Sequence, residues 1–436
     1  MTPRRARWTR RACAAAATVL VCATVAACSD SKTSPNAANS SAGGASSGAS
    51  ADNGEIVTDY LAYVGGTAGA ADASLSPIAI GWVNAQGGAN DFPEATDGAQ
   101  AAVRFINEEL GGIDGHPVEL HTCFIASAEE EGQRCGQQLL NDDAVSSIAF
   151  GAVFVGNQAL EAVIDGAKPI VVGVSSAPAD STAKNTYILY GDQTHVLAPW
   201  GTFARDVLHA QSAAIVFPSQ AGANSAAAAA KKGLEDAGLD VKSVGYEPDA
   251  TDLLGPLTAA GGQTADIVVP MTDVTGCVNL AKALTQIGSQ KPVVSNPLCL
   301  SPVVAEGLGD LPVGWTFGIA QTLPSDTTAP DAVAYVQAAT KHGLDKAATA
   351  NPFAALGWDL LLITAKLMNR AGADALSPTE MQSQLQAFDG PLVMGAPSID
   401  CGKYADAPAV CSDQTKFYTY GGKGAFTAAS GWLTPP

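Results

Sequence analysis

Short apolar runs alternate with amphipathic stretches along the chain from about residue 76 onward. Most of the apolar runs are nearly continuous in Val, Ile and Ala, which is typical of strands buried on both faces of a parallel sheet. The pattern predicts strands over residues 78–83, 118–123, 147–151, 170–174, 213–217, 267–269 and 292–295. Between them, apolar positions recur at helical spacing, which predicts helices over residues 94–110, 223–237, 278–287, 330–342 and 352–369.

The alternation of strands and helices predicts an α/β fold made of doubly wound parallel sheets with helices on both faces. The patterned part covers about 360 residues, which exceeds the usual size of a domain with one such sheet. We therefore expect two lobes. Residues 55–75 precede the first predicted strand as a pre-domain extension, and the pattern predicts no packing for them.

Residues 1–27 have the features of an export signal. An apolar run over 12–27 is short for a membrane span of about 20 residues, and it follows a positive segment made of Arg4, Arg5, Arg7, Arg10 and Arg11. The run ends in Ala26-Ala27 directly before Cys28. This arrangement resembles a bacterial lipoprotein signal, in which the cysteine is lipidated and begins the mature chain. An ordinary secretory signal followed by a chance cysteine is the alternative.

Residues 28–54 would then be the lipidated cysteine and a flexible tether, because Ser, Ala, Gly and Asn dominate them and large apolar residues are nearly absent. We expect the body to be exported and anchored by lipid to the outer face of the cytoplasmic membrane.

The net charge of the chain limits the kinds of partner that it can bind. The chain has 42 acidic and 23 basic residues, a formal net charge of −19, and loss of the five signal arginines lowers the charge to about −24. A nucleic-acid role is excluded, because such a role needs a basic surface. Docking on anionic lipid through protein charge is excluded for the same reason.

The nine cysteines support the exported location. Two lie in the signal and Cys28 follows it, so six remain in the body, and an even number in an exported chain indicates disulfides. They form three close pairs in the sequence, and we predict the bridges Cys123–Cys135, Cys277–Cys299 and Cys401–Cys411. No CxxC motif occurs and no histidine adjoins a cysteine, so a metal site is disfavoured.

Signatures of catalysis are missing from the sequence. The folded body, from residue 55 onward, contains no GxSxG motif, and the sequence contains no Walker loop and no GxGxxG motif. We therefore expect no enzyme activity, no cofactor and no metal.

Polar and small residues recur instead where the predicted strands end, which is where doubly wound sheets bind ligands. Each such residue alone could be a helix cap or a turn residue, but their recurrence at equivalent positions favours a binding site. The candidate ligand-binding residues are Asn84, Gln86, Phe154, Asn157, Ser175, Ser176, Gln220, Asp273 and Asn296.

Several segments resemble the branched-chain amino-acid-type solute-binding proteins of ABC transporters, which have the type I periplasmic-binding-protein fold. The most specific is GAQAAVRFINEELGGIDGHPVEL, which is similar to the first helix, glycine turn and second strand of that family. Other segments are residues 168–178, the Gly357-Trp358-Asp359 start of a late helix, and GPLVMGAPSIDCG. The resemblance covers roughly residues 76–430.

The resemblance implies two lobes joined by three crossovers near residues 190–197, 319–326 and 390–396. Lobe 1 would comprise 76–193 with 323–393, and lobe 2 would comprise 194–322 with 394–436. A small molecule would bind in the cleft between the lobes and close them, and an ABC permease with its ATPase subunits would recognise the closed form. The family is usually monomeric.

Some binding positions transfer from the family and others do not. Ser175 and Ser176 match the positions that hold the α-carboxylate and amino group of an amino acid, and Phe154 and Asn157 lie in the matching preceding loop. The aromatic residue of the second lobe is replaced at Gly222, and the acidic partner of an α-ammonium falls at Pro297. Asp273 is the one carboxylate left in a suitable place. The ligand could thus be a branched-chain amino acid or a neutral, amide-like or aromatic molecule.

Three function hypotheses follow. The first is a lipid-anchored solute-binding subunit of an ABC importer for a small polar or amphiphilic metabolite. The second is a ligand-sensing receptor subunit on the same fold, and the third is an exported hydrolase. Fold similarity alone cannot separate the first two.

Overall fold

The computed structural model describes residues 56–88, 91–175 and 177–436. The predicted signal, the predicted lipidation site Cys28, the tether and the candidate residue Ser176 lie outside the described residues. The described residues, from 56 onward, belong to one compact unit.

The first sheet has five strands in the order β2-β1-β3-β4-β5, and every pair of neighbours is parallel. The strands are β1 (Ile78–Ala85), β2 (Val118–Ile125), β3 (Val145–Phe150), β4 (Ile170–Val172) and β5 (Thr186–Ile188). The chain moves first to one side of β1 and then to the other, which is a doubly wound order. The predicted fold class is confirmed.

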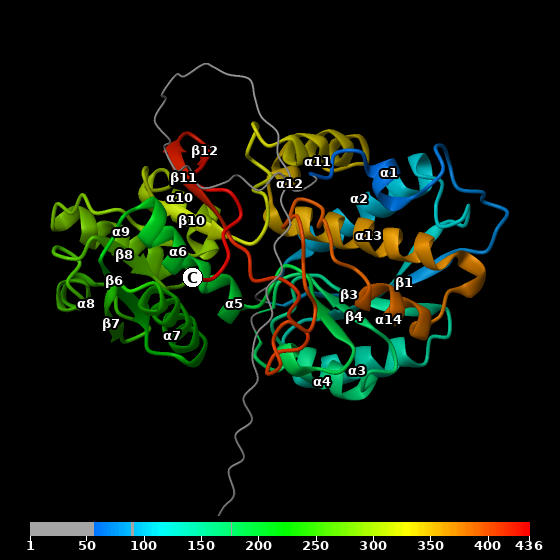
Figure 1. Ribbon diagram of the computed structural model, residues 1–436, viewed down its shortest axis with the longest axis horizontal. Helices are drawn as coiled ribbons and strands as arrows, with labels where there is room; N and C mark the ends of the chain where they lie inside the picture. Colours follow the sequence, from blue (N-terminus) through cyan, green and yellow to red (C-terminus); the bar gives the residue numbers. More distant parts are fainter. Residues whose placement is uncertain (1–55, 89–90, 176) are drawn as a thin grey trace, which may run out of the picture. The chain divides into compact units, whose positions relative to one another are not determined.

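Helices cover both faces of the first sheet (Figure 1). Successive residues of β1 face opposite sides. Ile80 and Trp82 belong to one hydrophobic core with α2 and α13, whereas Ala79 and Val83 belong to another with α3 and α4. These helices are α2 (Pro93–Glu109), α3 (Glu129–Leu140), α4 (Asn157–Ile164) and α13 (Pro352–Ala371). Because both faces are buried, the strand sequences are continuously apolar.

Helices α2 and α13 pack in close contact because each has a glycine at the crossing. A Cβ on Gly98 would lie 1.9 Å from the carbonyl oxygen of Ala354, and a Cβ on Gly357 would lie 2.0 Å from the carbonyl oxygen of Ala95. Any larger residue at either position would force the helices apart. The late Gly-Trp-Asp segment, expected at the start of a helix, lies inside α13, which begins five residues earlier at Pro352, and it packs onto α2.

The second half of the chain forms two further groups of strands. One has the order β7-β6-β8 and the other β12-β11-β10-β9, and a bridge between Val268 and Val293 joins them. The strands are β6 (Ser212–Pro218), β7 (Asp240–Tyr246), β8 (Ile267–Pro270), β9 (Val294–Ser295), β10 (Thr316–Ile319), β11 (Lys416–Gly422) and β12 (Ala425–Ala428). The pairings of β11 are antiparallel, in contrast to the other pairs in this half of the chain.

The faces of β6 are also buried on both sides. Ala213 and Ile215 lie in the core that includes α7 residues, and Ala214 and Val216 lie in the core with α8, α9 and α10 residues. The helices are α7 (Ala221–Asp236), α8 (Leu254–Ala259), α9 (Val274–Gln286) and α10 (Pro302–Leu308).

The chain passes between the two regions more than once. After β10 it returns to the first region, where Tyr335 of α11 and Leu385 of α14 join the core of α2 and α13, and it then continues to β11. The elements not yet named are α1 (Tyr60–Val64), η1 (Asp180–Thr182), α5 (Gln193–Leu197), α6 (Pro199–Thr202), η2 (Phe203–Val207), η3 (Pro297–Leu300), α11 (Pro330–Lys341), α12 (Lys346–Thr349), η4 (Ala373–Ala375) and α14 (Pro378–Gln386). The residue boundaries of the lobes stay a prediction.

The pre-domain extension is part of the first core. Tyr60 packs edge-on against Phe105 and Trp358, and Lys366 donates a hydrogen bond to the carbonyl oxygen of Tyr63. Three aromatic rings and an apolar helix face therefore fix a segment for which the sequence pattern predicted no packing.

The three predicted disulfides are the ones that the structure contains, with sequence separations of 12, 22 and 10 residues. None of the helices in the described part is both long and apolar enough to span a membrane.

Candidate functional site

The first group of candidate residues lies at the end of β1 and directly after it. Asn84 is fully buried, and its amide nitrogen donates to the carbonyl oxygen of Phe92 (2.8 Å) and to Oγ1 of Thr96 (3.1 Å). Its side-chain oxygen accepts from the backbone N–H of Ala152 at 2.9 Å. Asn84 thus joins the loops after β1 and β3, and in this conformation it positions them rather than facing solvent.

Thr96 shows how hydroxyl directions are fixed here. Its hydroxyl donates to Oε1 of Gln86 at 3.0 Å, and it accepts from the indole N–H of Trp82 and from Asn84. A hydroxyl has one hydrogen and two lone pairs, so all three are used. Gln86 is half-buried, and the hydrogen bond from Thr96 fixes the position of its side-chain oxygen.

Exposed apolar side chains stand on the loops after β3 and β4. Phe154 is 45% exposed and Val174 is 42% exposed. The ring of Phe154 lies 5.1 Å from that of Phe92, which in turn lies 4.6 Å from the ring of Phe353. Large exposed hydrophobic residues gathered at one edge indicate a surface that binds something apolar.

A polar cluster lies behind these loops. The amide nitrogen of Asn157, the first residue of α4, lies 2.5 Å from Oδ1 of Asp180 and donates to it. The hydroxyl of Ser175 donates to Oδ2 of the same carboxylate at 2.6 Å. Ser175, Asn157 and Asp180 are all buried. The structure therefore brings two predicted site residues together through an aspartate that was not among the sequence-based candidates.

Glu161 on α4 completes this cluster. Burial, and then the charge of and hydrogen bonding with Asp180, raise the pKa of Glu161 to about 8. Burial also raises the pKa of Asp180. Two carboxyl groups this close do not both ionise at neutral pH. Because Asp180 accepts two hydrogen bonds, it keeps the charge and Glu161 keeps the proton.

The candidate residues of the second region have different partners. Oδ1 of Asp273 accepts from the backbone N–H of Gly276 at 2.7 Å and caps α9. Asn296 caps η3 through the backbone N–H of Leu298 and donates to the carbonyl oxygen of Thr272. Gln220 is exposed at the start of α7 without a side-chain cap bond. The capping role that the sequence left open is thus observed for Asp273 and Asn296.

The second region also exposes apolar residues near its strand ends. Leu298, which follows β9, is 53% exposed. At Gly222, the position where the family's aromatic residue is missing, a Cβ would have no atom within 4 Å. The strand-end loops of this region therefore offer open space and apolar surface.

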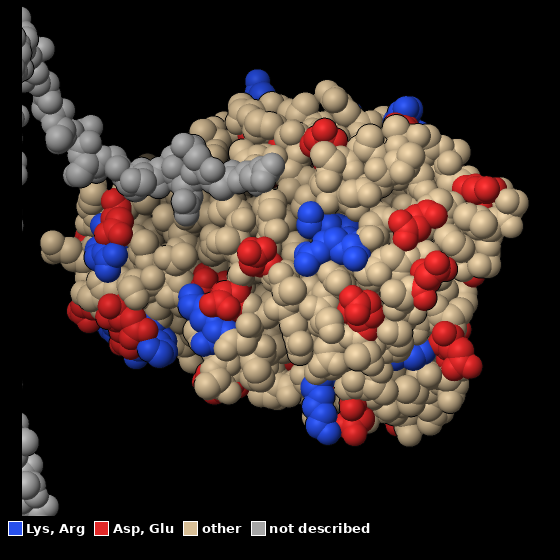
Figure 2. Space-filling model, turned by 45° about the vertical axis from the view of Figure 1, so that its right-hand side comes forward, with Lys and Arg blue, Asp and Glu red and all other residues tan. Residues whose placement is uncertain are grey.

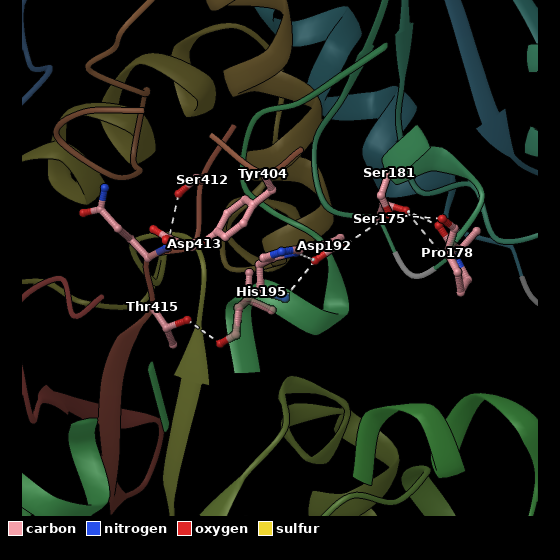
Figure 3. A network of polar contacts seen from close by, with 12 residues as sticks. Ser175, Pro178, Ser181, Asp192, His195, Tyr404, Ser412, Asp413 and Thr415 are labelled. Atoms are coloured by element: carbon pink, nitrogen blue, oxygen red, sulfur yellow. Dashed lines mark hydrogen bonds and ion pairs between the residues drawn. The ribbon is translucent and has the colours of Figure 1, made fainter. Parts of the chain in front are cut away.

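A second polar network links segments far apart in the sequence (Figure 3). Ser181 donates to Oδ2 of Asp192 (3.1 Å), and Oδ1 of Asp192 lies 2.6 Å from Nδ1 of His195. The ring of His195 lies 4.0 Å from that of Tyr404, whose hydroxyl donates to Asp413. Burial alone would raise the pKa of Asp192, but the bonds from His195 outweigh it and lower that pKa.

This network lies where the first predicted crossover passes a late segment of the chain. Thr415, two residues after Asp413 and directly before β11, donates to the backbone carbonyl of Val196 at 2.6 Å. None of these residues was predicted from the sequence, because no local pattern marks a histidine and an aspartate that meet a tyrosine about 200 positions later.

On the face shown in Figure 2, acidic and basic side chains are scattered among larger uncharged areas, and several side chains of opposite charge adjoin each other. Among the described residues no group of three or more His, Cys, Asp or Glu side chains could hold a metal ion.

Two surface hollows lie away from the strand-end loops. One of about 350 Å³ is lined by Asp114, His116 and residues 371–375. The other, of about 1120 Å³, is lined by the end of α9 and the segments that enter β9 and β10. Both lack every candidate residue, and the larger lies at the wrong end of its strands for the usual ligand position of such sheets.

A family model described as periplasmic binding protein matches residues 77–406. The chain therefore belongs to the periplasmic binding protein family. Membership of this family gives the protein an extracytoplasmic, solute-binding role, as predicted from the sequence. No curated protein sequence matches the chain.

Solved structures share the fold. A leucine-binding protein from Thermotoga maritima has a TM-score of 0.64 and 17% identity, covering 82% of this chain and 99% of its own. An ABC transporter solute-binding protein from R. palustris, in complex with 4-hydroxybenzoate, has a TM-score of 0.63 and 17% identity, covering 83% and 98%. A fatty acid ABC transporter substrate-binding protein from Thermomonospora curvata has a TM-score of 0.61 and 17% identity, covering 85% and 95%.

Proposed function

We propose that this protein captures a small amphiphilic solute at the strand-end loops of its two lobes and delivers it, by lobe closure, to the permease of an ABC importer. The observation that carries the proposal is the exposed apolar surface of Phe154, Val174 and Leu298 beside polar loop residues. Exposing such side chains to water is unfavourable, and a bound apolar group would cover them.

The chemistry of the loops supports a ligand with both an apolar body and a polar head. Phe154 and Val174 offer apolar contact, while Gln86 and the Ser175 loop offer hydrogen bonds. Leucine, 4-hydroxybenzoate and fatty acids, which are named for three structural neighbours, all have this division. The proposed ligand belongs to the same broad class.

A thermal-shift panel on the disulfide-intact body, from about residue 54, tests this function. Amino acids, amides, aromatic acids, polyols and nucleosides should be included, and a ligand that binds only the native state raises the melting temperature. Two matched variants locate the site. Val174→Ser should weaken binding of the best compound, whereas Val313→Ser, at a residue 66% exposed elsewhere, should leave its affinity unchanged. Equal effects of the two variants would remove the β4 loop from the site.

The lipid anchor is a separate part of the proposal. The full chain expressed in a bacterium should partition into detergent and carry a lipid on Cys28, measured by mass spectrometry of the N-terminal peptide. Cys28→Ala should release the protein from the membrane fraction. An unlipidated mature terminus at another residue would contradict the anchor and leave the binding function standing.

A further inference from the structure

The Ser175 hydroxyl is already committed to the protein. Its oxygen lies 2.6 Å from Oδ2 of Asp180 and 3.2 Å from the carbonyl oxygen of Ala177. The backbone N–H of Ala177 donates to the same hydroxyl oxygen at 3.2 Å. A hydroxyl carries one hydrogen, and the shortest contact gives it to the carboxylate.

The direction of this bond depends on Asp180 being an acceptor. Its other oxygen accepts from the amide of Asn157, so two donors stabilise the ionised form. The neighbouring Glu161 is the group that holds the proton, for the reason given above. Oε1 of Glu161 is buried and has no hydrogen-bond partner among the described residues.

The strand-end loops offer no cationic side chain in their sequence to replace the hydrogen that Ser175 donates to Asp180. The loops that follow β1, β3 and β4, residues 84–92, 151–157 and 173–182, contain no Lys, Arg or His. The corresponding loops of the second region, residues 219–224, 271–276 and 296–303, also contain none. These six loops do contain Asp91, Asp180 and Asp273. Among the ionisable side chains of these loops a ligand carboxylate would therefore meet only acidic ones, and the Ser175 hydroxyl has no hydrogen left to donate to it.

The geometry points to a ligand whose polar head donates hydrogen bonds to the Ser175 oxygen, such as an ammonium, amide or hydroxyl group, and not to a carboxylate. This inference rests on the proposed function and names its ligand class as neutral or cationic amphiphiles. It makes Asp180 a specificity-determining residue that acts through Ser175.

Matched pairs of probes test the inference by calorimetry on the intact body. Leucinamide with leucine, 4-hydroxybenzamide with 4-hydroxybenzoate, and hexanamide with hexanoate each share one apolar group and differ in the head. In every pair that binds, the amide should be at least about tenfold tighter, because an unmatched buried polar contact costs that much or more. Tighter binding of the carboxylate would overturn the inference alone.

Asp180→Asn gives the sharpest variant because it keeps the shape of the side chain. If its oxygen still accepts from Asn157, its amide nitrogen faces Ser175 and donates, so the serine hydrogen turns outward. The amide-to-carboxylate affinity ratio should fall about tenfold or more toward the carboxylate. Adding Ser175→Ala, which leaves no hydroxyl in either direction, should make the ratio the same with and without Asp180→Asn. A ratio unchanged by Asp180→Asn in a folded variant would contradict the inference.

If no probe of any pair binds, the result counts against the proposed function. A measurement without ligand then tests the inference separately. Neutron diffraction of the deuterated body locates the hydrogens directly. The expected result is a deuterium on Oγ of Ser175, directed at Oδ2 of Asp180. A deuterium on the Asp180 carboxyl group, directed at Ser175, would overturn the inference.

Discussion

The strand-end loops of the two regions are held in different ways. In the first region, side chains bind across loops: Asn84 joins the loops after β1 and β3, and Asp180 joins Asn157 to Ser175. In the second region, Asp273 caps the helix that it precedes. Cross-linked polar groups form a preorganised surface, whereas a cap stabilises one helix terminus. The first region is therefore a prebuilt binding surface.

The second region has a disulfide bond between two of the elements at its strand ends. The Cys277–Cys299 disulfide joins α9 to η3, and these elements carry the caps Asp273 and Asn296 at their starts. Its loops are therefore fixed relative to each other by this disulfide as well as by the hydrogen bond from Asn296 to the carbonyl oxygen of Thr272.

The largest expected effect comes from breaking the cross-loop bonds. Asn84→Ala removes three hydrogen bonds and leaves buried groups unpaired, so it should destabilise the body by about 2–4 kcal/mol. Asn296→Ala, the matched change in the second region, removes a cap and one part-buried hydrogen bond to the carbonyl oxygen of Thr272 and should cost about 1–2 kcal/mol. Thermal and denaturant unfolding measure both. Equal losses would contradict the difference between the two regions.

A similar loss should follow from removing the covalent link. Replacing Cys277 and Cys299 together by alanine opens a loop with a sequence separation of 22 residues and should cost about 3 kcal/mol through chain entropy. Replacing Cys401 and Cys411, whose separation is 10 residues, provides the control with a slightly smaller entropic loss. Hydrogen exchange should show that the first change loosens residues 271–303 while the control does not.

A smaller effect should depend on pH through Glu161. Its folded pKa of about 8 lies above the ordinary value of 4.5, so its contribution to stability is complete below about pH 4.5 and is lost as the pH rises through about 8. The Glu161→Gln variant cannot ionise at this position. Its melting temperature minus that of the wild type should rise by a few degrees between about pH 6 and pH 9. Parallel melting curves over that range would show that Glu161 ionises normally.

The sequence predicted β1 and β6 well because both are central strands whose faces are covered, so their residues are mostly apolar. Predicted strands at 78–83, 118–123 and 213–217 match β1, β2 and β6 to within two residues, although β2 is an edge strand with an exposed Glu119. The edge strands β7 and β5 were missed. The antiparallel strands β11 and β12 were also missed, since βαβ patterning does not apply to them.

The site was predictable only in part. The sequence correctly placed Asn84, Asn157 and Ser175 at or after the ends of β1, β3 and β4, although Asn84 lies within β1 and Asn157 is the first residue of α4. Their partners were not predictable, since Asp180 meets Asn157 across 23 residues and no local spacing encodes that contact. Hydrogen-bond direction, which carries the inference about the ligand head, exists only once the chain is folded.

The most direct test of solute capture by both regions is hydrogen exchange of the body with and without the panel compound that gives the largest thermal shift. We predict simultaneous protection of residues 151–157 and 173–182 in the first region and of residues 296–303 in the second. Protection confined to the hollow beside β9 and β10, around residues 281–293, would contradict that capture.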